Sequence, residues 1–382
     1  MKRSKGLRIC YIGMKHIPSR EGGIEVAVTE MAARMAALGY EITCYNRGNL
    51  RINDVTAEKN RGDQNIRIKY VPTIPYGGLA AVSSSFCGAV CAALGNYDII
   101  HFHAEGPAFM CWLPKLFGKK VVVTIHGLDY QRVKWGAIAS FYIKLGEKNA
   151  ARFADEVIVL SEHMKEYFRT AYGRETHFIP NGVNRPVLRD AKLMKEKYEL
   201  EKDGYILFLG RIVPEKGLQR LLRTFKEVKT GRKLVIAGGS ADTDRKFWNE
   251  LRETAREDPR ILFTGFVQGQ LLDELYSNAY FCVFPSDLEG MSLSLLEAMS
   301  YGNSCVVSDI PEFVEVVEDH ALIFQRAGAD DFRRKMQMLC DDEALVKDYR
   351  EGVSDFVCKK YKWDDVVVET LRLYRKVLGL RL

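Results

Sequence analysis

The sequence lacks any long uninterrupted apolar run. Its longest candidate, residues 79–94, is broken by three serines and a glycine and falls short of the ~20 apolar residues that a membrane-spanning helix needs. The basic start of the chain is followed by an apolar stretch of only a strand's length, residues 7–13, with no small-residue cleavage site after it. We therefore expect a protein without a membrane span that works in the cytoplasm.

Metal and nucleophile motifs are also missing. The chain holds 9 cysteines, but no two of them form a CxxC pair, so a zinc site is not expected. G-x-S-x-G and G-x-G-x-x-G are absent, which excludes the nucleophile elbow of α/β-hydrolases and the NAD fingerprint. An Asp-x-Asp spacing occurs at Asp242 and Asp244, but it lies in a polar segment before a helix. We expect no metal and no other cofactor.

Charge is distributed unevenly between the two halves. Residues 1–185 hold 25 Lys and Arg against 16 Asp and Glu, a net charge of +9 in a chain whose overall charge is +6. Such a field favours an anionic partner, such as a phospholipid surface or a lipid-phosphate acceptor. No helix-turn-helix, zinc finger or Arg-rich tract accompanies the charge, so no nucleic-acid partner is expected.

Short apolar segments alternate with amphipathic helical patterns along the whole chain. This alternation predicts βαβ units, and hence parallel sheets with helices on both faces. A length of 382 residues suits two domains, and the pattern restarts at Tyr205. We expect two doubly wound Rossmann-like domains that face each other across a cleft, residues 1–185 and 186–382, with a last helix near 363–378 that crosses back to the first. The expected strands are 7–13, 41–45, 66–71, 98–102, 120–125, 156–160, 205–210, 234–237, 261–264, 281–284 and 305–308.

The loops after these strands are the candidate sites, because ligands of open parallel sheets bind at the carboxyl ends of the strands. The first such loop carries Gly22 and Gly23 directly before a helical pattern. Glycine lets a ligand approach the backbone, and a helix N-terminus offers free N–H groups, a combination that suits a phosphate. The alternative is a plain tight turn.

Two cations follow the strand expected at 205–210. Arg211 and Lys216 stand in a loop framed by Gly210 and Gly217. Fixed cations at a strand end stabilise the charge that develops on a leaving diphosphate. The alternative is a solvated basic loop.

A third motif follows the strand at 281–284 and runs from Glu289 to Glu297. Glu289 can accept hydrogen bonds from sugar hydroxyls, and Glu297, about two helical turns later on a similar face, can accept them from a ribose. The alternative is an acid at a helix start and an unrelated surface glutamate. The N–H groups that can face an anion at the start of the helix belong to Gly290, Met291, Ser292 and Leu293.

Two histidines also end strands of the first domain. His126 precedes Gly127 at the end of the strand at 120–125, and His103 ends the strand before it. Their strand-end position favours a site role, more strongly for His126 than for His103. The alternative for each is a structural histidine.

Together these motifs resemble the family-4 retaining glycosyltransferases of the two-Rossmann-domain (GT-B) type, over nearly the whole chain. Each motif alone is weak, but they occur in the family's order, and the ordered set is specific. The first domain, especially Ile12-Gly13, Ile17-Pro18 and residues 126–135, is similar to the branch that includes bacterial rhamnosyltransferases of capsule and cell-wall polysaccharide synthesis. The matching segments are Gly22 to Glu25, His126-Gly127, Ile179 to Val183, Gly210-Arg211, Glu215 to Gly217 and the pair Glu289 and Glu297.

The resemblance implies roles for the residues that bind the donor. Arg211 and Lys216 would bind the donor diphosphate, and Gly23 would contact phosphate from the other side. Glu297 would bind the ribose and Glu289 the transferred sugar.

The resemblance also implies the contacts around the sugar and the base. His126 would lie against the donor sugar, and the backbone of Phe266 and Val267 would face the base. The amides of Met291 to Leu293 would contact sugar and phosphate. Many family members have Glu-Gly-Phe-Gly-Leu-Pro where this chain has Glu289 to Ser294, so the packing around the sugar, and with it the donor identity, is not carried over.

The function that the resemblance implies is that of a retaining, metal-independent hexosyltransferase. It would move a sugar from a nucleotide-diphosphate sugar, such as dTDP-rhamnose or a UDP-sugar, to a glycan or lipid-linked saccharide in cell-surface polysaccharide synthesis. Two alternatives are a nucleotide-sugar 2-epimerase of the same architecture and a non-catalytic nucleotide-sugar binding protein.

A helix expected over residues 135–151 combines aromatic and basic side chains. Such a helix can lie on an anionic bilayer, which would make the enzyme peripheral on the inner face of the plasma membrane. The alternative is an ordinary packed helix with a solvated basic face. The side chains concerned are Trp135, Phe141 and Tyr142 beside Lys134, Lys144, Lys148 and Arg152.

Overall fold

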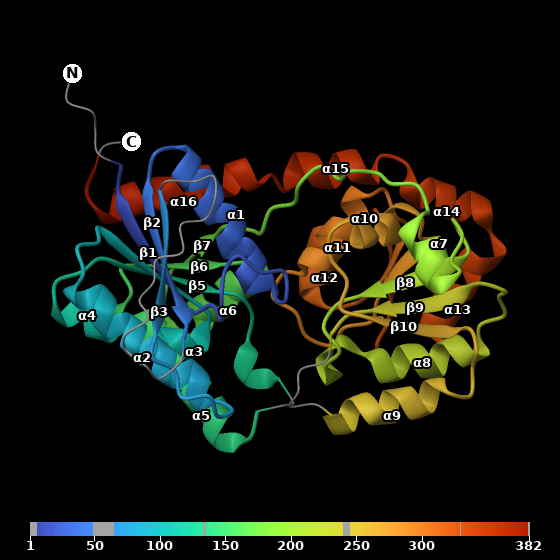
Figure 1. Ribbon diagram of the computed structural model, residues 1–382, viewed down its shortest axis with the longest axis horizontal. Helices are drawn as coiled ribbons and strands as arrows, with labels where there is room; N and C mark the ends of the chain where they lie inside the picture. The colour runs from blue at the N-terminus through green and yellow to red at the C-terminus, as the bar shows by residue number, and fades with distance from the viewer. Residues whose placement is uncertain (1–5, 49–64, 133–134, 240–244, 329, 381–382) are drawn as a thin grey trace. The chain divides into compact units, whose positions relative to one another are not determined.

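The computed structural model describes residues 6–48, 65–132, 135–239, 245–328 and 330–380. The chain forms two compact units: Met1–Gly182 with Trp363–Leu382, and Val183–Lys362. The first division falls three residues before the one expected at 185. The last helix, α16 (Trp363–Val377), belongs to the first unit and contacts its helix α1 (Gly23–Ala37) (Figure 1).

The first unit is built on a seven-stranded sheet with the order β3-β2-β1-β4-β5-β6-β7, and every neighbouring pair is parallel. The strand order reverses between β1 and β4, which is the mark of a doubly wound sheet. Its strands are β1 (Arg8–Ile12), β2 (Glu41–Arg47), β3 (Ile66–Val71), β4 (Ile99–His103), β5 (Val121–Ile125), β6 (Glu156–Val159) and β7 (His177–Phe178).

The two faces of this sheet differ because side chains alternate along each strand. Ile12, Phe102 and Val123 lie in an apolar core with the helices of one face, whereas Tyr11 and His101 contact α1 and α16 on the other. Figure 1 shows α1 and α16 above the sheet and α2, α3 and α5 below it. The helices of the core face are α2 (Leu79–Leu94), α3 (Glu105–Ala108), α4 (Trp112–Leu116), α5 (Ala137–Phe153) and α6 (Glu162–Tyr172).

The second unit repeats the architecture with six parallel strands in the order β10-β9-β8-β11-β12-β13. Here the order reverses between β8 and β11. The strands are β8 (Tyr205–Leu209), β9 (Lys233–Ala237), β10 (Ile261–Gly265), β11 (Phe281–Phe284), β12 (Cys305–Ser308) and β13 (Leu322–Phe324). Both sheets are doubly wound, as the alternating pattern predicts.

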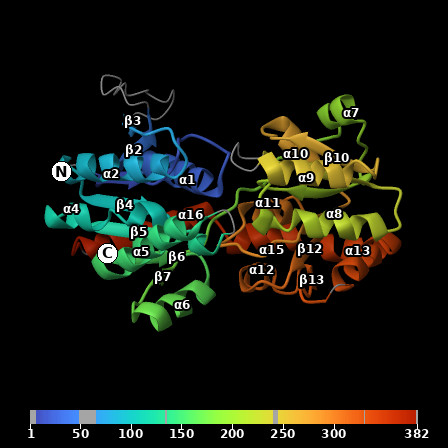
Figure 2. The same ribbon diagram turned by 90° about the horizontal axis from the view of Figure 1, so that it is seen from below.

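Helices cover both faces of the second sheet. Helices α8 (Leu218–Glu227), α9 (Arg245–Ala255) and α13 (Asp331–Asp341) pack on one face, where they lie next to one another in Figure 2. Their buried apolar side chains, such as Phe225 and Phe332, share one core with those of the strands. The remaining helices are α7 (Leu193–Tyr198), α10 (Gln270–Ser277), α11 (Leu293–Ser300), α12 (Pro311–Val317), α14 (Glu343–Arg350) and α15 (Val353–Lys360).

No helix in the described part of the chain is both long and apolar enough to cross a membrane. The helix expected over 135–151 begins later, at Ala137, because Gly136 has an extended backbone and acts as its N-cap. It ends at Phe153.

Candidate functional site

The predicted donor residues of the second unit come together where its strand order reverses. Arg211 and Lys216 follow β8, the segment from Glu289 follows β11, and these two strands pair with each other. Because parallel strands end at the same edge of a sheet, the loops meet where open α/β sheets bind ligands. The Asp287 N–H donates to the Glu215 carbonyl at 2.8 Å. The site is therefore assembled by the topology of the sheet.

Glycines let the loops of this edge approach one another closely. Gly217 has φ +69°, and a Cβ there would lie 1.9 Å from the carbonyl oxygen of Pro285. A Cβ on Gly238 would lie 1.8 Å from the carbonyl oxygen of Gly210. Any side chain at these two positions would push the loops after β8, β9 and β11 apart.

Lys216 and Glu289 form a nearly buried ion pair at the centre of this edge. Lys216 Nζ lies 2.5 Å from Glu289 Oε1, and the two side chains are 12% and 11% exposed. Ser286 Oγ donates to the same carboxylate oxygen at 2.8 Å. A pair so little exposed is screened weakly by salt, and it fixes the ammonium and the carboxylate in one place. The sequence predicted a role for each residue but not their contact.

Helix α11 starts directly after this pair. Ser292 is its N-cap and accepts a hydrogen bond from the Leu295 N–H at 3.4 Å. Gly290 and Met291 are buried before it, and Leu293 is its first residue. The first turn of such a helix carries backbone N–H groups that lack intrahelical partners and the positive end of the helix dipole.

Glu297 lies one turn farther along α11 and is half-buried. The Tyr276 hydroxyl donates to its Oε2 at 3.3 Å, and the Tyr276 ring stacks on Tyr301 with centroids 5.1 Å apart. These contacts orient the Glu297 carboxylate. It lies on α11, the helix that starts just after Glu289.

The other predicted residues of the second unit lie on neighbouring loops. Arg211 is exposed directly after β8. Phe266 is 47% exposed and Val267 is buried, in the loop that follows Gly265 at φ +72°. The Gly238 N–H donates to the Gly265 carbonyl at 2.9 Å, so a hydrogen bond joins this loop to the loop after β9.

In the first unit, Gly22 is the N-cap of α1 and Gly23 its first residue. The side chain of Glu25 folds back over this end, because its Oε1 accepts from the Lys15 N–H at 3.0 Å. A Cβ on Gly22 would lie 2.3 Å from the other carboxylate oxygen. The end of the Glu25 side chain can turn away from such a Cβ, and Gly22 has an extended backbone, so the packing does not require a glycine at position 22. Phosphate contact by Gly23 stays a prediction.

His126 and His103 are in direct contact. His103 Nδ1 and His126 Nε2 lie 3.0 Å apart, and His103 is fully buried whereas His126 is half-buried. Burial lowers the pKa of His126 to about 4 and that of His103 well below its usual value, so both imidazoles are neutral near pH 7.

A buried acid pair lies just after β4. Ala104 has φ +74°, unusual for a residue with a side chain, and it turns the chain into α3 at Glu105. Glu105 and Glu147 are both fully buried. Within the described residues, the carboxyl oxygens of Glu105 meet no ordinary hydrogen-bond donor. Gly146 lets the backbone of α5 approach the backbone at Glu105, since a Cβ on Gly146 would lie 2.0 Å from the Glu105 carbonyl oxygen.

The two acids of this pair differ in protonation. Burial, followed by the charge of Asp129 and the contact with Glu147, raises the pKa of Glu105. Burial acts in the same sense on Glu147, but hydrogen bonds from Glu105 and from three further donors outweigh it and lower its pKa. These opposite directions assign the proton shared by the pair to Glu105 and leave Glu147 ionised. The other donors all reach Glu147 Oε1: Lys144 Nζ at 2.8 Å, the Tyr167 hydroxyl at 2.7 Å and the Tyr172 hydroxyl.

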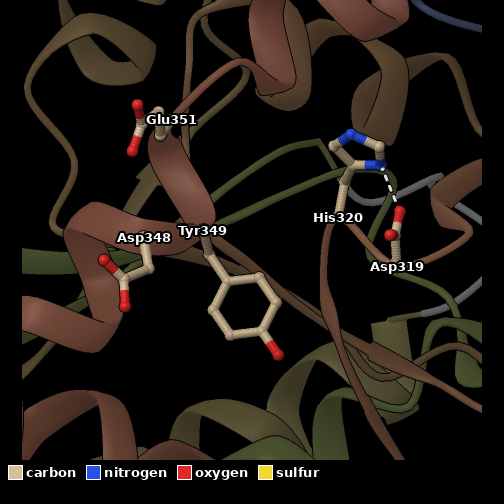
Figure 3. Close-up of a pocket in the computed structure, with 5 residues that line it drawn as sticks. All are labelled: Asp319, His320, Asp348, Tyr349 and Glu351. Carbon is tan, nitrogen blue, oxygen red and sulfur yellow. Dashed lines mark ion pairs between the residues drawn. The ribbon is translucent and has the colours of Figure 1, made fainter.

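A separate pocket of the second unit is shown in Figure 3. It has a volume of ≈ 160 Å³ and is lined by Asp319, His320, Asp348, Tyr349 and Glu351. The Asp319 carboxylate and the His320 ring lie 2.9 Å apart. His320 precedes β13, so the pocket lies at the amino end of the strand, opposite the edge that carries Lys216. It contains no residue of the predicted site.

A metal site does not emerge from the described residues, where no three His, Cys, Asp or Glu side chains gather to hold an ion. Asp242 and Asp244 lie outside the described residues.

Comparison with protein families shows what the two units are. Residues 21–185 match the family described as Glycosyltransferase Family 4, and residues 190–355 match the family described as Glycosyl transferases group 1. The chain carries a glycosyltransferase domain of each kind and is a glycosyltransferase.

Individual relatives agree with this class. An uncharacterized glycosyltransferase of Methanocaldococcus jannaschii is 25% identical over 97% of this chain and 98% of its own. O-antigen chain mannosyltransferase B of Escherichia coli is 29% identical over 47% of this chain and 48% of its own. Neither is named as a rhamnosyltransferase, so that branch remains a proposal.

Solved structures share the fold. Sucrose-phosphate synthase of Thermosynechococcus elongatus has a TM-score of 0.84 at 22% identity, over 98% of this chain and 99% of that one. HepE of Anabaena in complex with UDP-glucose has a TM-score of 0.76 at 15% identity, over 96% and 99%. The predicted fold class, two Rossmann-like domains of the GT-B type, is confirmed.

Sequence reasoning missed Ser286, Tyr276 and the acid pair of Glu105 and Glu147. Ser286 and Tyr276 act through contacts with predicted residues that lie elsewhere in the sequence. The acid pair offered a weak signal, a glutamate two residues after a strand-end histidine, which is too common to single out.

Proposed function

We propose that this glycosyltransferase transfers a hexose with retention and without a metal, from a nucleotide-diphosphate sugar to a glycan or lipid-linked saccharide of the cell surface. The observation that carries the proposal is the Lys216–Glu289 pair, held at the strand-order reversal immediately before the N-terminus of α11. A cation, a carboxylate that can accept hydrogen bonds from hydroxyls and a helix N-terminus in one place match the parts of a sugar nucleotide.

In this proposal the donor diphosphate binds next to Lys216. The Lys216 ammonium, Arg211 and the first-turn amides of α11 bind its anionic oxygens. These groups stabilise the negative charge that develops as the diphosphate leaves. Glu289 keeps Lys216 in place through Oε1, and the second carboxylate oxygen of Glu289 accepts a hydrogen bond from a sugar hydroxyl. His126 also contacts the transferred sugar.

The relatives bear on the donor and the acceptor. HepE is known in complex with UDP-glucose, which supports a UDP-sugar, with dTDP-rhamnose as the other candidate. The E. coli relative acts on the O-antigen chain, which supports a role in cell-surface polysaccharide synthesis. The M. jannaschii and E. coli relatives are both named as transferases, which favours transfer over epimerisation and over binding alone.

A panel of sugar nucleotides tests this function. We expect one or a few UDP- or dTDP-sugars to raise the melting temperature, and we expect transfer to a lipid-linked saccharide to give a product whose anomeric configuration, read by NMR, equals that of the donor. The rate should not change in EDTA. Conversion of the donor to its 2-epimer in the absence of an acceptor, or binding without transfer, would establish one of the alternatives instead.

We propose further that α5 binds an anionic membrane. Ile138 and Phe141 are 88% and 66% exposed near its start, and Lys148 and Arg152 are exposed farther along the same face. The face thus joins apolar side chains to cations, as a helix at a bilayer surface does.

Not every residue expected on this face lies there. Lys144 is bound to Glu147, and Tyr142 packs on Phe109 with ring centroids 4.5 Å apart. Trp135 is half-buried, and Lys134 lies outside the described residues. The proposed membrane face is therefore narrower than the sequence predicted.

Vesicle flotation tests the membrane face. The full chain should float with vesicles that contain anionic lipid at low salt and should not float with neutral vesicles. Ile138→Ser with Phe141→Ser should weaken the binding about tenfold or more, because two exposed apolar side chains leave the interface. Val187→Ser with Leu188→Ser, an exposed apolar pair of the second unit, is the matched control. Absence of binding at low salt would remove the idea.

A further inference from the structure

The face of the first sheet that packs on α1 and α16 carries a row of buried histidines. His101 and His103 stand two residues apart on β4, so both point to this face. The parallel pairing of β4 with β5 sets Thr124 opposite His103. The two imidazoles stack with centroids 4.3 Å apart and an interplanar angle of 28°.

Both ring nitrogens of His101 are already engaged. Nδ1 lies 2.5 Å from the Tyr374 hydroxyl of α16, and Nε2 lies 2.7 Å from Thr124 Oγ1. The Tyr11 ring packs against His103 with centroids 5.3 Å apart. His101 is thus immobilised, and His103, held between His101 and Tyr11, has little freedom to turn away from His126.

The hydrogen bond between His103 and His126 holds a single proton. Both imidazoles are neutral, so one of His103 Nδ1 and His126 Nε2 donates and the other accepts. His103 Nε2 is buried, and the described part of the chain offers it no partner.

The unpartnered nitrogen decides which tautomer is favoured. If His126 donated, His103 would carry its own proton on Nε2, and a buried N–H would remain unpaired. If His103 donates, only a lone pair remains unpaired, which proteins tolerate more often than an unpaired buried N–H. The second arrangement therefore costs less.

We propose that His103 is a positioning residue whose Nδ1–H donates to Nε2 of His126, so that His126 carries its own proton on Nδ1 and offers it to the transferred sugar. The tautomer follows from the contacts of the first unit alone, and only its use rests on the proposed function. A neutral N–H in a fixed direction suits a sugar oxygen, and the second nitrogen of a histidine is commonly what fixes the first.

Nitrogen NMR of the full chain labelled with ¹⁵N-histidine tests the tautomer directly. The chain has 7 histidines, and the signal lost in His126→Gln identifies His126. We expect His126 to be the Nδ1–H tautomer in the unmodified protein and to shift towards Nε2–H in His103→Phe, which keeps a ring but has no donor. An Nε2–H tautomer of His126 in the unmodified protein would overturn the inference, whether or not His103→Phe folds.

Activity separates positioning from a purely structural role. His103→Phe should lower kcat about tenfold, and His103→Asn, whose amide can place an N–H near the former Nδ1, should recover most of the rate. Equal losses in both variants would argue against the donor role. If no transfer is found with any donor, the proposed function fails while the NMR result still decides the tautomer.

Discussion

Replacing Lys216 by Ala should lower kcat by roughly 10²-fold or more, by analogy with the loss of one charge-stabilising donor from a preorganised site. Lys216 is the cation that Glu289 and the loop after β8 hold at the strand-order reversal, with only 12% of its side chain exposed. A fixed, nearly buried charge needs no reorganisation as the diphosphate leaves, so its loss affects the transition state most. Steady-state transfer rates with the donor found in the panel measure the effect.

Two further variants separate this role from general effects. Lys226→Ala removes the same charge from the exposed side of α8, where Lys226 pairs with Glu257, and should change the rate less than about twofold, because exposed ion pairs contribute little. Lys216→Ala with Glu289→Gln removes the uncompensated buried carboxylate and should recover stability without recovering activity. A near-normal rate in Lys216→Ala would reject the assignment of Lys216.

The sequence predicted that Arg211, Lys216 and Glu289 lie at one sheet edge, because strand ends are visible in it. Apolar runs such as residues 205–209 and 281–284 end at glycine or proline, and parallel topology brings the ends of such runs to one edge. The same signal fails for β7 and β13, which were not predicted. They have two and three residues, too few to show a period.

Contacts between distant residues could not be predicted. Lys216 and Glu289 are 73 residues apart, and His101 and Tyr374 are 273 apart. The sequence shows that all four residues are polar, but it does not show which of them meet. The pairing is set by the order of the strands and by the packing of α16 on the first unit. Polar side chains buried in this way are therefore where the structure adds most to the sequence.

Replacing Glu147 by Gln should cost about 3–5 kcal/mol of folding free energy, the usual effect of removing one member of a buried charged network. Its carboxylate accepts from Lys144, Tyr167 and Tyr172 and, in our assignment, from protonated Glu105. Glutamine has one oxygen for these donors and adds two N–H groups of its own. Lys144 is 39% exposed and can turn to water, which favours the lower end of the range. Urea denaturation at pH 7 measures the loss.

Glu105→Gln is the matched control in the same cluster, and pH gives it a distinct signature. Burial raises the pKa of Glu105, so the folded protein keeps a proton that the unfolded chain loses above about pH 4.3. The stability that this neutral acid contributes is therefore present at low pH and declines as pH rises towards the folded pKa. Glutamine keeps an N–H donor for Glu147 and does not titrate, so Glu105→Gln should gain stability relative to the unmodified protein between pH 5 and pH 8. Parallel curves for the two proteins across that range would show that Glu105 is ionised in the fold, and the assignment of the shared proton would then be wrong.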